Sequence, residues 1–145
     1  MKGLIQRVSH ASVVVNRQTV GAIDGGLLLF LGIEKQDDPA AADKLLHRVL
    51  HYRIFPDEQG KMNRSLVKAG GGLLIVSQFT LVADTGRGMR PSFSDGAPPE
   101  QGRILYDYFV NQAQTKLPNV QTGCFGADMK VHLLNDGPVT FLLEV

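Results

Sequence analysis

The chain has 145 residues, a formal net charge of +1, 43% hydrophobic residues and 20% charged residues. This is the size of one domain, and such a chain buries roughly 70% of its unfolded surface, so it needs no disulfide or metal as a staple. The balance of 15 basic and 14 acidic residues argues against a protein that coats itself with nucleic acid.

No targeting segment is expected. The first seven residues carry Lys2 and Arg7 and have no continuous apolar core, which argues against a signal peptide. The longest apolar run, residues 27–33, is too short to cross a bilayer. Cys124 is the single cysteine and cannot form an internal disulfide, which fits a reducing compartment. A cytoplasmic protein is therefore expected.

The N-terminal third predicts β-strands. Apolar residues alternate with small or polar ones over residues 4–15, which is the period of a half-buried strand. Residues 16–18 form a turn candidate before a strand over 20–23. Residues 27–31 are apolar on both faces and bounded by glycines, which predicts a central strand.

A helix is predicted after Asp38-Pro39, because aspartate caps the first amides and proline suits the first helical position. An apolar stripe follows at helical spacing, and the helix is expected to end near Tyr52. Residues 55–60 predict a turn. After the glycines at 70–72, residues 73–81 predict a second buried strand.

Residues 83–99 predict a long loop rich in Gly, Pro, Ser and Arg, and such loops are usually functional or disordered. A second helix starts at 98–100 and stops before Pro118. Strands are expected over 120–125, 129–134 and 139–145, with a turn at 135–138. The expected fold is a single α/β domain over residues 1–145, with two β-layers in a barrel-like arrangement and two main helices packed on one face.

Several common catalytic motifs are absent, including the Gly-x-Ser-x-Gly elbow, the Walker phosphate loop and the dinucleotide fingerprint. His47 and His51 could share a metal, but no third ligand is evident, so a solvated helix face is expected. His10 and His132 are expected to be structural. Cys124 has no obvious partner and is expected to be a buried, inert thiol. No metal or other cofactor is expected.

Two segments are candidates for function. Arg87 and Arg90 lie among glycines in the long loop, and composition alone does not separate a solvated loop from a phosphate contact. Residues 77–81 stand where the second buried strand opens into that loop. On its own this segment favours a strand that simply runs out into a loop, rather than a functional site.

In order and spacing, several segments resemble the D-aminoacyl-tRNA deacylases, and the resemblance covers essentially the whole chain. The segments are Leu4-Ile5-Gln6-Arg7-Val8, Tyr52-Arg53-Ile54-Phe55, Gly60-Lys61-Met62-Asn63, Ser77-Gln78-Phe79-Thr80-Leu81, Gly88-Met89-Arg90-Pro91-Ser92-Phe93, Gly126-Ala127-Asp128-Met129 and Asn135-Asp136-Gly137-Pro138-Val139-Thr140. One departure is Gly102, where the family usually carries alanine near the pocket mouth.

The resemblance implies a homodimer that needs no metal and hydrolyses the ester between a D-amino acid and the terminal adenosine of tRNA. It also implies removal of glycine mischarged on alanine tRNA. The implied active site lies between subunits: Ser77, Gln78, Phe79 and Thr80 of one face the Gly137-Pro138 turn of the other. Met129 is implied to help hold the adenosine. The Gly137–Pro138 peptide is implied to be cis.

Hydrolysis of an aminoacyl ester needs a positioned water and stabilisation of the oxyanion, for which amides near Phe79 and Thr80 are candidates. A nucleophilic Thr80 needs a base, and none is evident in the sequence. We therefore expect the ribose 2′-hydroxyl of tRNA to help activate the water. Two alternatives stay open: a Thr80-nucleophile hydrolase of small esters or peptides, and a non-catalytic RNA-binding domain.

Overall fold

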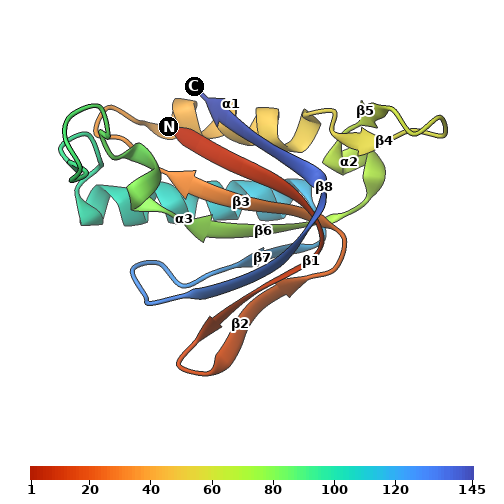
Figure 1. Ribbon diagram of the computed structural model, residues 1–145, viewed down its shortest axis with the longest axis horizontal. Helices are drawn as coiled ribbons and strands as arrows, with labels where there is room; N and C mark the ends of the chain where they lie inside the picture. The colour runs from red at the N-terminus through yellow and green to blue at the C-terminus, as the bar shows by residue number, and fades with distance from the viewer.

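A strongly bent β-sheet and two long helices make up most of the protein, shown in Figure 1 as a computed structural model that describes residues 1–145. The strands are β1 Lys2–Val15, β2 Gln18–Ile23, β3 Gly26–Gly32, β4 Phe55–Pro56, β5 Met62–Arg64, β6 Gly72–Ser77, β7 Val120–Thr122 and β8 Lys130–Glu144. The helices are α1 Pro39–His51, α2 Leu66–Ala69 and α3 Pro99–Lys116, and a 3-10 turn, η1, spans Phe79–Val82.

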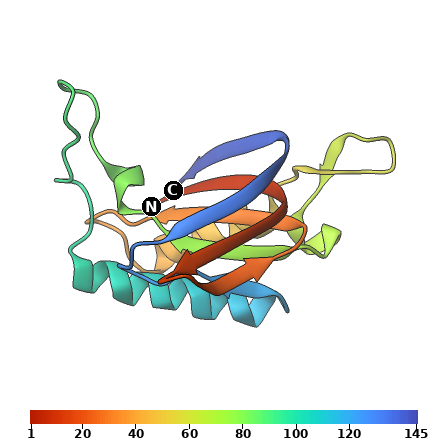
Figure 2. The same ribbon diagram turned by 60° about the horizontal axis from the view of Figure 1, so that its bottom comes forward.

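The main sheet has the order β2-β1-β3-β6-β7, and β8 pairs with β1. Strands β3, β6 and β7 are parallel, whereas β1 is antiparallel to β2, β3 and β8. The two ends of the sheet approach each other, because a Cβ added at Gly21 of β2 would lie 2.3 Å from the carbonyl oxygen of Thr122 in β7. The result is the nearly closed, barrel-like sheet that was predicted (Figure 2).

The central strands bury both of their faces, as their uninterrupted apolar sequence predicts. Leu29 and Ile75 face the helices, in a cluster that includes the buried stripe of α1 and Phe109 of α3. Leu28 and Leu74 point the other way, into a smaller core inside the curved sheet. Both long helices therefore cover one face of the sheet, which confirms the predicted arrangement.

The start of α1 follows the predicted capping pattern. Asp38 is the N-cap, its carboxylate accepts a hydrogen bond of 2.8 Å from the amide of Ala41, and Pro39 is the first helical residue. The helix ends at His51, one residue before the predicted end. No helix in the structure combines the length and the apolar character needed to cross a bilayer.

Three predicted strands were wrong in their extent. The strand predicted over 73–81 ends at Ser77, and the chain turns into η1, where Val82 packs over Gly32. The strands predicted over 129–134 and 139–145 form one strand, because both halves of β8 pair with β1. The segment that was predicted as a turn between them is a bulge within β8.

Three further elements differ from the prediction. The strand predicted over 120–125 stops at Thr122. The turn predicted at 55–60 belongs to a short β4–β5 hairpin, which is followed by α2. Neither the hairpin partner β5 nor the four-residue α2 was predicted.

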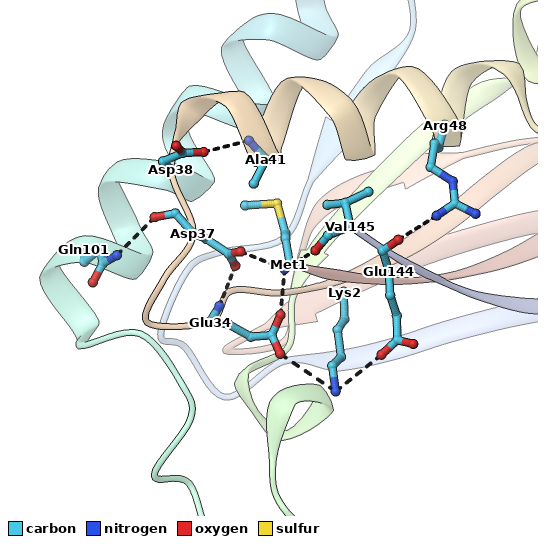
Figure 3. A network of polar contacts seen from close by, with 10 residues as sticks. All are labelled: Met1, Lys2, Glu34, Asp37, Asp38, Ala41, Arg48, Gln101, Glu144 and Val145. Atoms are coloured by element: carbon cyan, nitrogen blue, oxygen red, sulfur yellow. Dashed lines mark hydrogen bonds and ion pairs between the residues drawn. The ribbon is translucent and has the colours of Figure 1, made fainter.

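A polar network joins the start of β1 to the segment before α1 and to the end of β8 (Figure 3). The α-ammonium group of Met1 donates to Glu34 Oε2 at 2.6 Å, to Asp37 Oδ1 at 2.7 Å and to the carbonyl of Val145 at 3.3 Å. Burial lowers the pKa of this ammonium, but the hydrogen bonds and charges of Asp37 and Glu34 outweigh burial and leave the pKa above its ordinary value of 8.0.

Candidate functional site

The carboxyl ends of the parallel strands lie at one edge of the sheet, the edge at which open α/β sheets usually bind ligands. Ser77 is the last residue of β6 and is in register with Leu31 of β3. The amide of Gly123, just after β7, donates to the carbonyl of Ile75 at 2.9 Å. This contact brings the segment that leads to Met129 to the same edge as Ser77–Thr80.

A depression of about 350 Å³ lies beside η1 and is lined by Leu4, Phe30, Gln78, Thr80 and Leu81. None of these side chains titrates near neutral pH. The hydroxyl of Thr80 accepts a hydrogen bond from the amide of Gln78. Phe79 and Thr80 open the 3-10 turn, and amides at the start of a helix have no acceptor within it. The depression thus offers neutral hydrogen-bonding groups and no acid or base.

A larger depression, of about 460 Å³, lies between the starts of α1 and α3. It contains the carboxylates of Asp37, Asp38 and Glu100 but none of the predicted site residues. Its lining includes no side-chain hydroxyl group and no residue at the end of a strand. The smaller depression is therefore the better candidate site, although it has less volume.

Exposed aromatic side chains flank the candidate site. Phe79 is 67% exposed, Phe93 is 46% exposed, and their ring centroids lie 5.1 Å apart. The loop that carries Phe93 reaches away from the sheet (Figure 2) and is held at its base by paired backbone hydrogen bonds between Asp84 and Ser92. Arg87 and Arg90 lie exposed in this loop and form no ion pair.

Gly137 and Pro138 form the exposed bulge of β8. Gln6 of β1 pairs with Thr140, whereas Val8 pairs with Asn135, so the residues between Asn135 and Thr140 loop out of the ladder. The Gly137–Pro138 peptide is cis, as the resemblance implied, and Gly137 has a φ of 154°. A Cβ at Gly137 would lie 2.6 Å from the amide nitrogen of Val139, so the bulge has no room for a side chain there.

Two side chains hold this bulge from its flanks. The Asn135 amide donates to the carbonyls of Arg7 and Val139, both at 3.0 Å, and its oxygen accepts from the amide of Val139 at 3.2 Å. The Arg7 guanidinium donates to the carbonyl of Asp136 at 3.1 Å and pairs with its carboxylate at 3.1 Å. These contacts fix the backbone on both sides of Gly137–Pro138.

The bulge and the Ser77–Thr80 segment lie far apart within one chain. The bulge lies opposite Arg7 of β1, whereas Ser77 lies at the level of Gly3 of β1. These two levels differ by about 13 Å along the strands. Strands β1 and β3 lie between β8 and β6, which adds about 14 Å across the sheet. A single amino acid cannot touch both parts of one chain.

The remaining predicted residues have mixed outcomes. Met129 is half-buried against the core inside the curved sheet, and its sulfur accepts from the amide of Cys124 at 3.3 Å. Cys124 is exposed, so the prediction of a buried thiol was wrong: β7 ends at Thr122 and leaves Cys124 in the connection to β8. Gly102 is buried in α3 against Phe125 and does not line the depression.

The four histidines are all exposed, as expected for His47 and His51. The rings of these two stack at a centroid distance of 4.3 Å, and His51 Nδ1 lies 2.9 Å from the carbonyl of His47. No group of three or more His, Cys, Asp or Glu side chains is placed to share a metal ion. His10 and His132 lie on the outer face of the curved sheet and make no recorded side-chain hydrogen bond.

Sequence reasoning missed Arg7 and Asn135 as residues that hold the bulge, and Leu4 and Phe30 as residues that line the depression. Arg7 and Asn135 are 128 positions apart and meet only because β1 pairs with β8. The available signal was the resemblance itself, since both residues lie in matching segments.

The fold is shared with solved structures over the whole chain. A structure of the c-Myc DNA Unwinding Element Binding Protein matches with a TM-score of 0.96 and 36% identity, covering 100% of this chain and 99% of the other. A probable eukaryotic D-amino acid tRNA deacylase matches with a TM-score of 0.86 and 17% identity over 99% and 98% of the two chains, which shows a common fold. The chain is thus a small α/β protein with the nearly closed sheet of these structures.

Sequence relatives make the family specific. Residues 4–144 match the family described as D-Tyr-tRNA(Tyr) deacylase. The D-aminoacyl-tRNA deacylase of Stutzerimonas stutzeri (strain A1501) is 65% identical over 144 residues, which is 99% of each chain. That of Pseudomonas entomophila (strain L48) is 63% identical over 145 residues, which is 100% of each chain. The protein belongs to the D-Tyr-tRNA(Tyr) deacylase family.

Proposed function

We propose that this enzyme hydrolyses the ester that joins a D-amino acid to the terminal adenosine of tRNA, releasing the free D-amino acid and the tRNA. Family membership over residues 4–144 supports the reaction. The observation that carries the proposal is the uncharged depression beside Ser77, Gln78, Phe79 and Thr80, where hydroxyl and amide groups meet at the ends of parallel strands. Such a site suits an ester that is already activated.

The tRNA takes part in the hydrolysis of the aminoacyl ester that it carries. The depression holds no side chain that can act as a general base, and the recorded partner of the Thr80 hydroxyl is a neutral amide. The ribose 2′-hydroxyl, which lies next to the ester, helps activate the attacking water. The amides of Phe79 and Thr80 donate to the developing oxyanion. No cofactor is needed for this chemistry.

The active site is shared between two subunits of a homodimer. Gly137–Pro138 of one subunit completes the site that begins with Ser77–Thr80 of the other, which accounts for their separation within one chain. The open face of the sheet supports such a contact, since Leu142 there is 50% exposed and Leu4 and Phe30 are only half-buried. Val139 and Leu143 of the same strand pack against the helices of their own chain.

The backbone of the bulge selects the D-amino acid over the L-amino acid. The Gly137–Pro138 bulge presents backbone without a side chain at Gly137, held in place by Asn135 and Arg7. Its carbonyls accept from the substrate ammonium and leave no room on the side where an L side chain projects. Glycine has no side chain to exclude, so glycyl-tRNA mischarged on alanine tRNA is also a substrate.

The remaining contacts follow from the same arrangement. Met129 contacts the adenosine from the carboxyl edge, and Arg87 and Arg90 of the exposed loop reach tRNA phosphates. The enzyme works in the cytoplasm, without membrane or DNA as a partner, and residues 1–145 act as a single domain. Gly102 affects stability rather than the reaction, because it contacts Phe125 and not the depression.

The deciding experiment incubates the enzyme with D-tyrosyl-tRNA and L-tyrosyl-tRNA and follows release of the amino acid. We expect rapid hydrolysis of the D ester and survival of the L ester. A Thr80-nucleophile hydrolase would also cleave small D-tyrosyl esters that lack a ribose, and a pure RNA-binding domain would cleave nothing. Either result would replace the proposal.

A further inference from the structure

The β4–β5 hairpin and α2 form a projecting basic surface at the end of the molecule opposite η1 (Figure 1). From Arg53 to Lys68 the chain carries four basic and two acidic residues, a net charge of +2. The whole chain has a net charge of +1, so all the other residues together carry −1. This hairpin surface, which we define as residues 53–68, is thus a local concentration of positive charge.

Two of the four cations of the hairpin surface are available for a partner. Lys61 and Lys68 are exposed and their ammonium groups form no hydrogen bond within the chain, and none of the four basic side chains forms an ion pair. The carboxylate of Asp57 is occupied by neutral donors: the amides of Gln59 and Lys61, both at 2.9 Å, and the side chain of Asn63 at 2.6 Å. These contacts stiffen the tip of the hairpin.

Two arginines brace the same surface from within. Arg53 donates to the backbone and side-chain oxygens of Asn63, at 2.9 and 2.8 Å. Arg64 donates to the carbonyl of Lys68 at 2.7 Å, which ties the hairpin to the end of α2. The hairpin is therefore presented as a fixed shape, which lowers the entropic cost of binding.

The hairpin surface is tied directly to the Gly137–Pro138 bulge. The Arg7 guanidinium donates to the carbonyl of Ile54 at 2.6 Å, just before β4, and to the carbonyl of Asp136 at 3.1 Å. From Phe55 the chain runs extended to Asp57 and then turns, with the amide of Gly60 donating to the carbonyl of Asp57 at 3.0 Å, so the tip at Gly60 lies within about 14 Å of Phe55. A nucleic acid whose 3′ end lies at the bulge would pass along this surface.

The long loop is a weaker candidate for the main phosphate contact. Residues 83–98 contain two arginines and two aspartates, so their net charge is zero, against +2 for the hairpin surface. Phosphate binding is driven by cations that replace condensed counterions, so net positive charge decides which surface contributes more.

We infer that the hairpin surface binds the backbone phosphates of the tRNA acceptor arm, with Lys61 and Lys68 as the principal contacts. This inference rests on the proposed function, because it assumes that the aminoacyl end lies at the bulge. In a homodimer with shared sites, the hairpin surface belongs to the subunit that supplies Gly137–Pro138. The subunit that supplies Ser77–Thr80 then adds the weaker phosphate contacts of Arg87 and Arg90.

The test compares Lys61→Glu/Lys68→Glu with the control Lys44→Glu/Lys116→Glu, which makes the same change in charge at exposed positions of α1 and α3. Hydrolysis of D-tyrosyl-tRNA and binding of uncharged tRNA are measured over a range of salt concentrations. Hydrolysis of D-tyrosyl-adenosine, which has no phosphate, is measured in parallel.

We expect the hairpin variant to raise KM for D-tyrosyl-tRNA about tenfold or more and to make the salt slope shallower by about one to two released ions. Its kcat and its activity on D-tyrosyl-adenosine should stay at the wild-type level, and the control should resemble the wild type. Unchanged KM and salt slope in the hairpin variant would overturn the inference while leaving the deacylase proposal standing. If the wild type cleaves neither substrate, the proposed function itself has failed.

Discussion

Thr80 carries the single hydroxyl group that lines the depression, which makes its role the clearest question at the scale of one residue. Its hydroxyl accepts from Gln78 and has no recorded basic partner. We expect Thr80→Val to keep deacylation of D-tyrosyl-tRNA within about tenfold of wild type, because loss of a true nucleophile usually costs on the order of 10⁴ or more. Single-turnover release of D-tyrosine measures the effect.

The counterpart of Thr80→Val is a change in the substrate. A D-tyrosyl-tRNA whose terminal ribose lacks the 2′-hydroxyl should be hydrolysed far more slowly by the wild-type enzyme. An inactive Thr80→Val variant combined with normal hydrolysis of the 2′-deoxy substrate would identify Thr80 as the nucleophile and remove the RNA-assisted mechanism.

At the scale of the element, Gly102 is an unfavourable choice within α3. A helix-interior glycine costs about 0.5–1 kcal/mol relative to alanine. The added Cβ would meet Phe125 at 3.5 Å, an ordinary van der Waals distance. We expect Gly102→Ala to raise the free energy of unfolding by about 0.5–1 kcal/mol without changing kcat, as measured by urea denaturation. A destabilised variant would mean that the space beside Phe125 is smaller than its geometry indicates.

The ends of β1 and β8 and the start of α1 are joined by the Met1 ammonium, so their stability depends on pH. The folded-state pKa of this group is raised above 8.0. Its contribution is therefore complete below about pH 8 and is lost as the pH rises through the folded-state pKa. We expect the urea midpoint of the wild type to fall above pH 8.

Asp37→Asn should lower the midpoint at pH 7 and flatten this dependence, because it removes a charge 2.7 Å from the ammonium. Asp38→Asn is the control: it keeps an N-cap side chain and has no recorded contact with Met1. If Asp37→Asn and the wild type lose stability in parallel between pH 8 and 10, another group is responsible.

Local patterns predicted the elements whose periodicity reports a buried face. Residues 27–31 and the stripe of α1 were predicted well, because burial on both faces or on one helical stripe leaves a regular apolar pattern. The apolar pattern misled where apolar residues lie outside a regular strand. Phe79 and Leu81 extend the apolar pattern beyond β6, yet both belong to η1, and Leu81 lines the depression.

Features set by strand pairing left no local signal. Asn135, Asp136, Gly137 and Pro138 are all common turn formers, so a hairpin was the natural prediction. Only the continuous pairing of β1 with both halves of β8 turns this segment into a bulge. The site residues could be proposed from resemblance, but the separation of Ser77–Thr80 from Gly137–Pro138 required the topology.

At the scale of the whole molecule, this separation predicts that the active site is built by two chains. A two-fold dimer makes the same contact twice, so each dimer has two sites, and each site takes Ser77–Thr80 from one subunit and Gly137–Pro138 from the other. Two different inactive variants should then restore each other when they share a dimer. Thr80→Trp fills the depression, and Gly137→Val forces a side chain against Val139.

We expect each variant alone to be inactive and the two, co-expressed in equal amounts, to recover about a quarter of wild-type activity. Half of the dimers are then mixed, and in each of these one of the two sites combines an intact Ser77–Thr80 segment with an intact bulge. Separately purified variants mixed just before the assay serve as the control and should stay inactive until subunits exchange. Light scattering should give a dimer mass for every sample. A monomer mass with full activity, or a folded mixed dimer with no recovery, would show that each chain completes its own site. The contact between Gly137–Pro138 and the substrate would then have to be abandoned, because Gly137–Pro138 and Ser77–Thr80 lie too far apart in one chain.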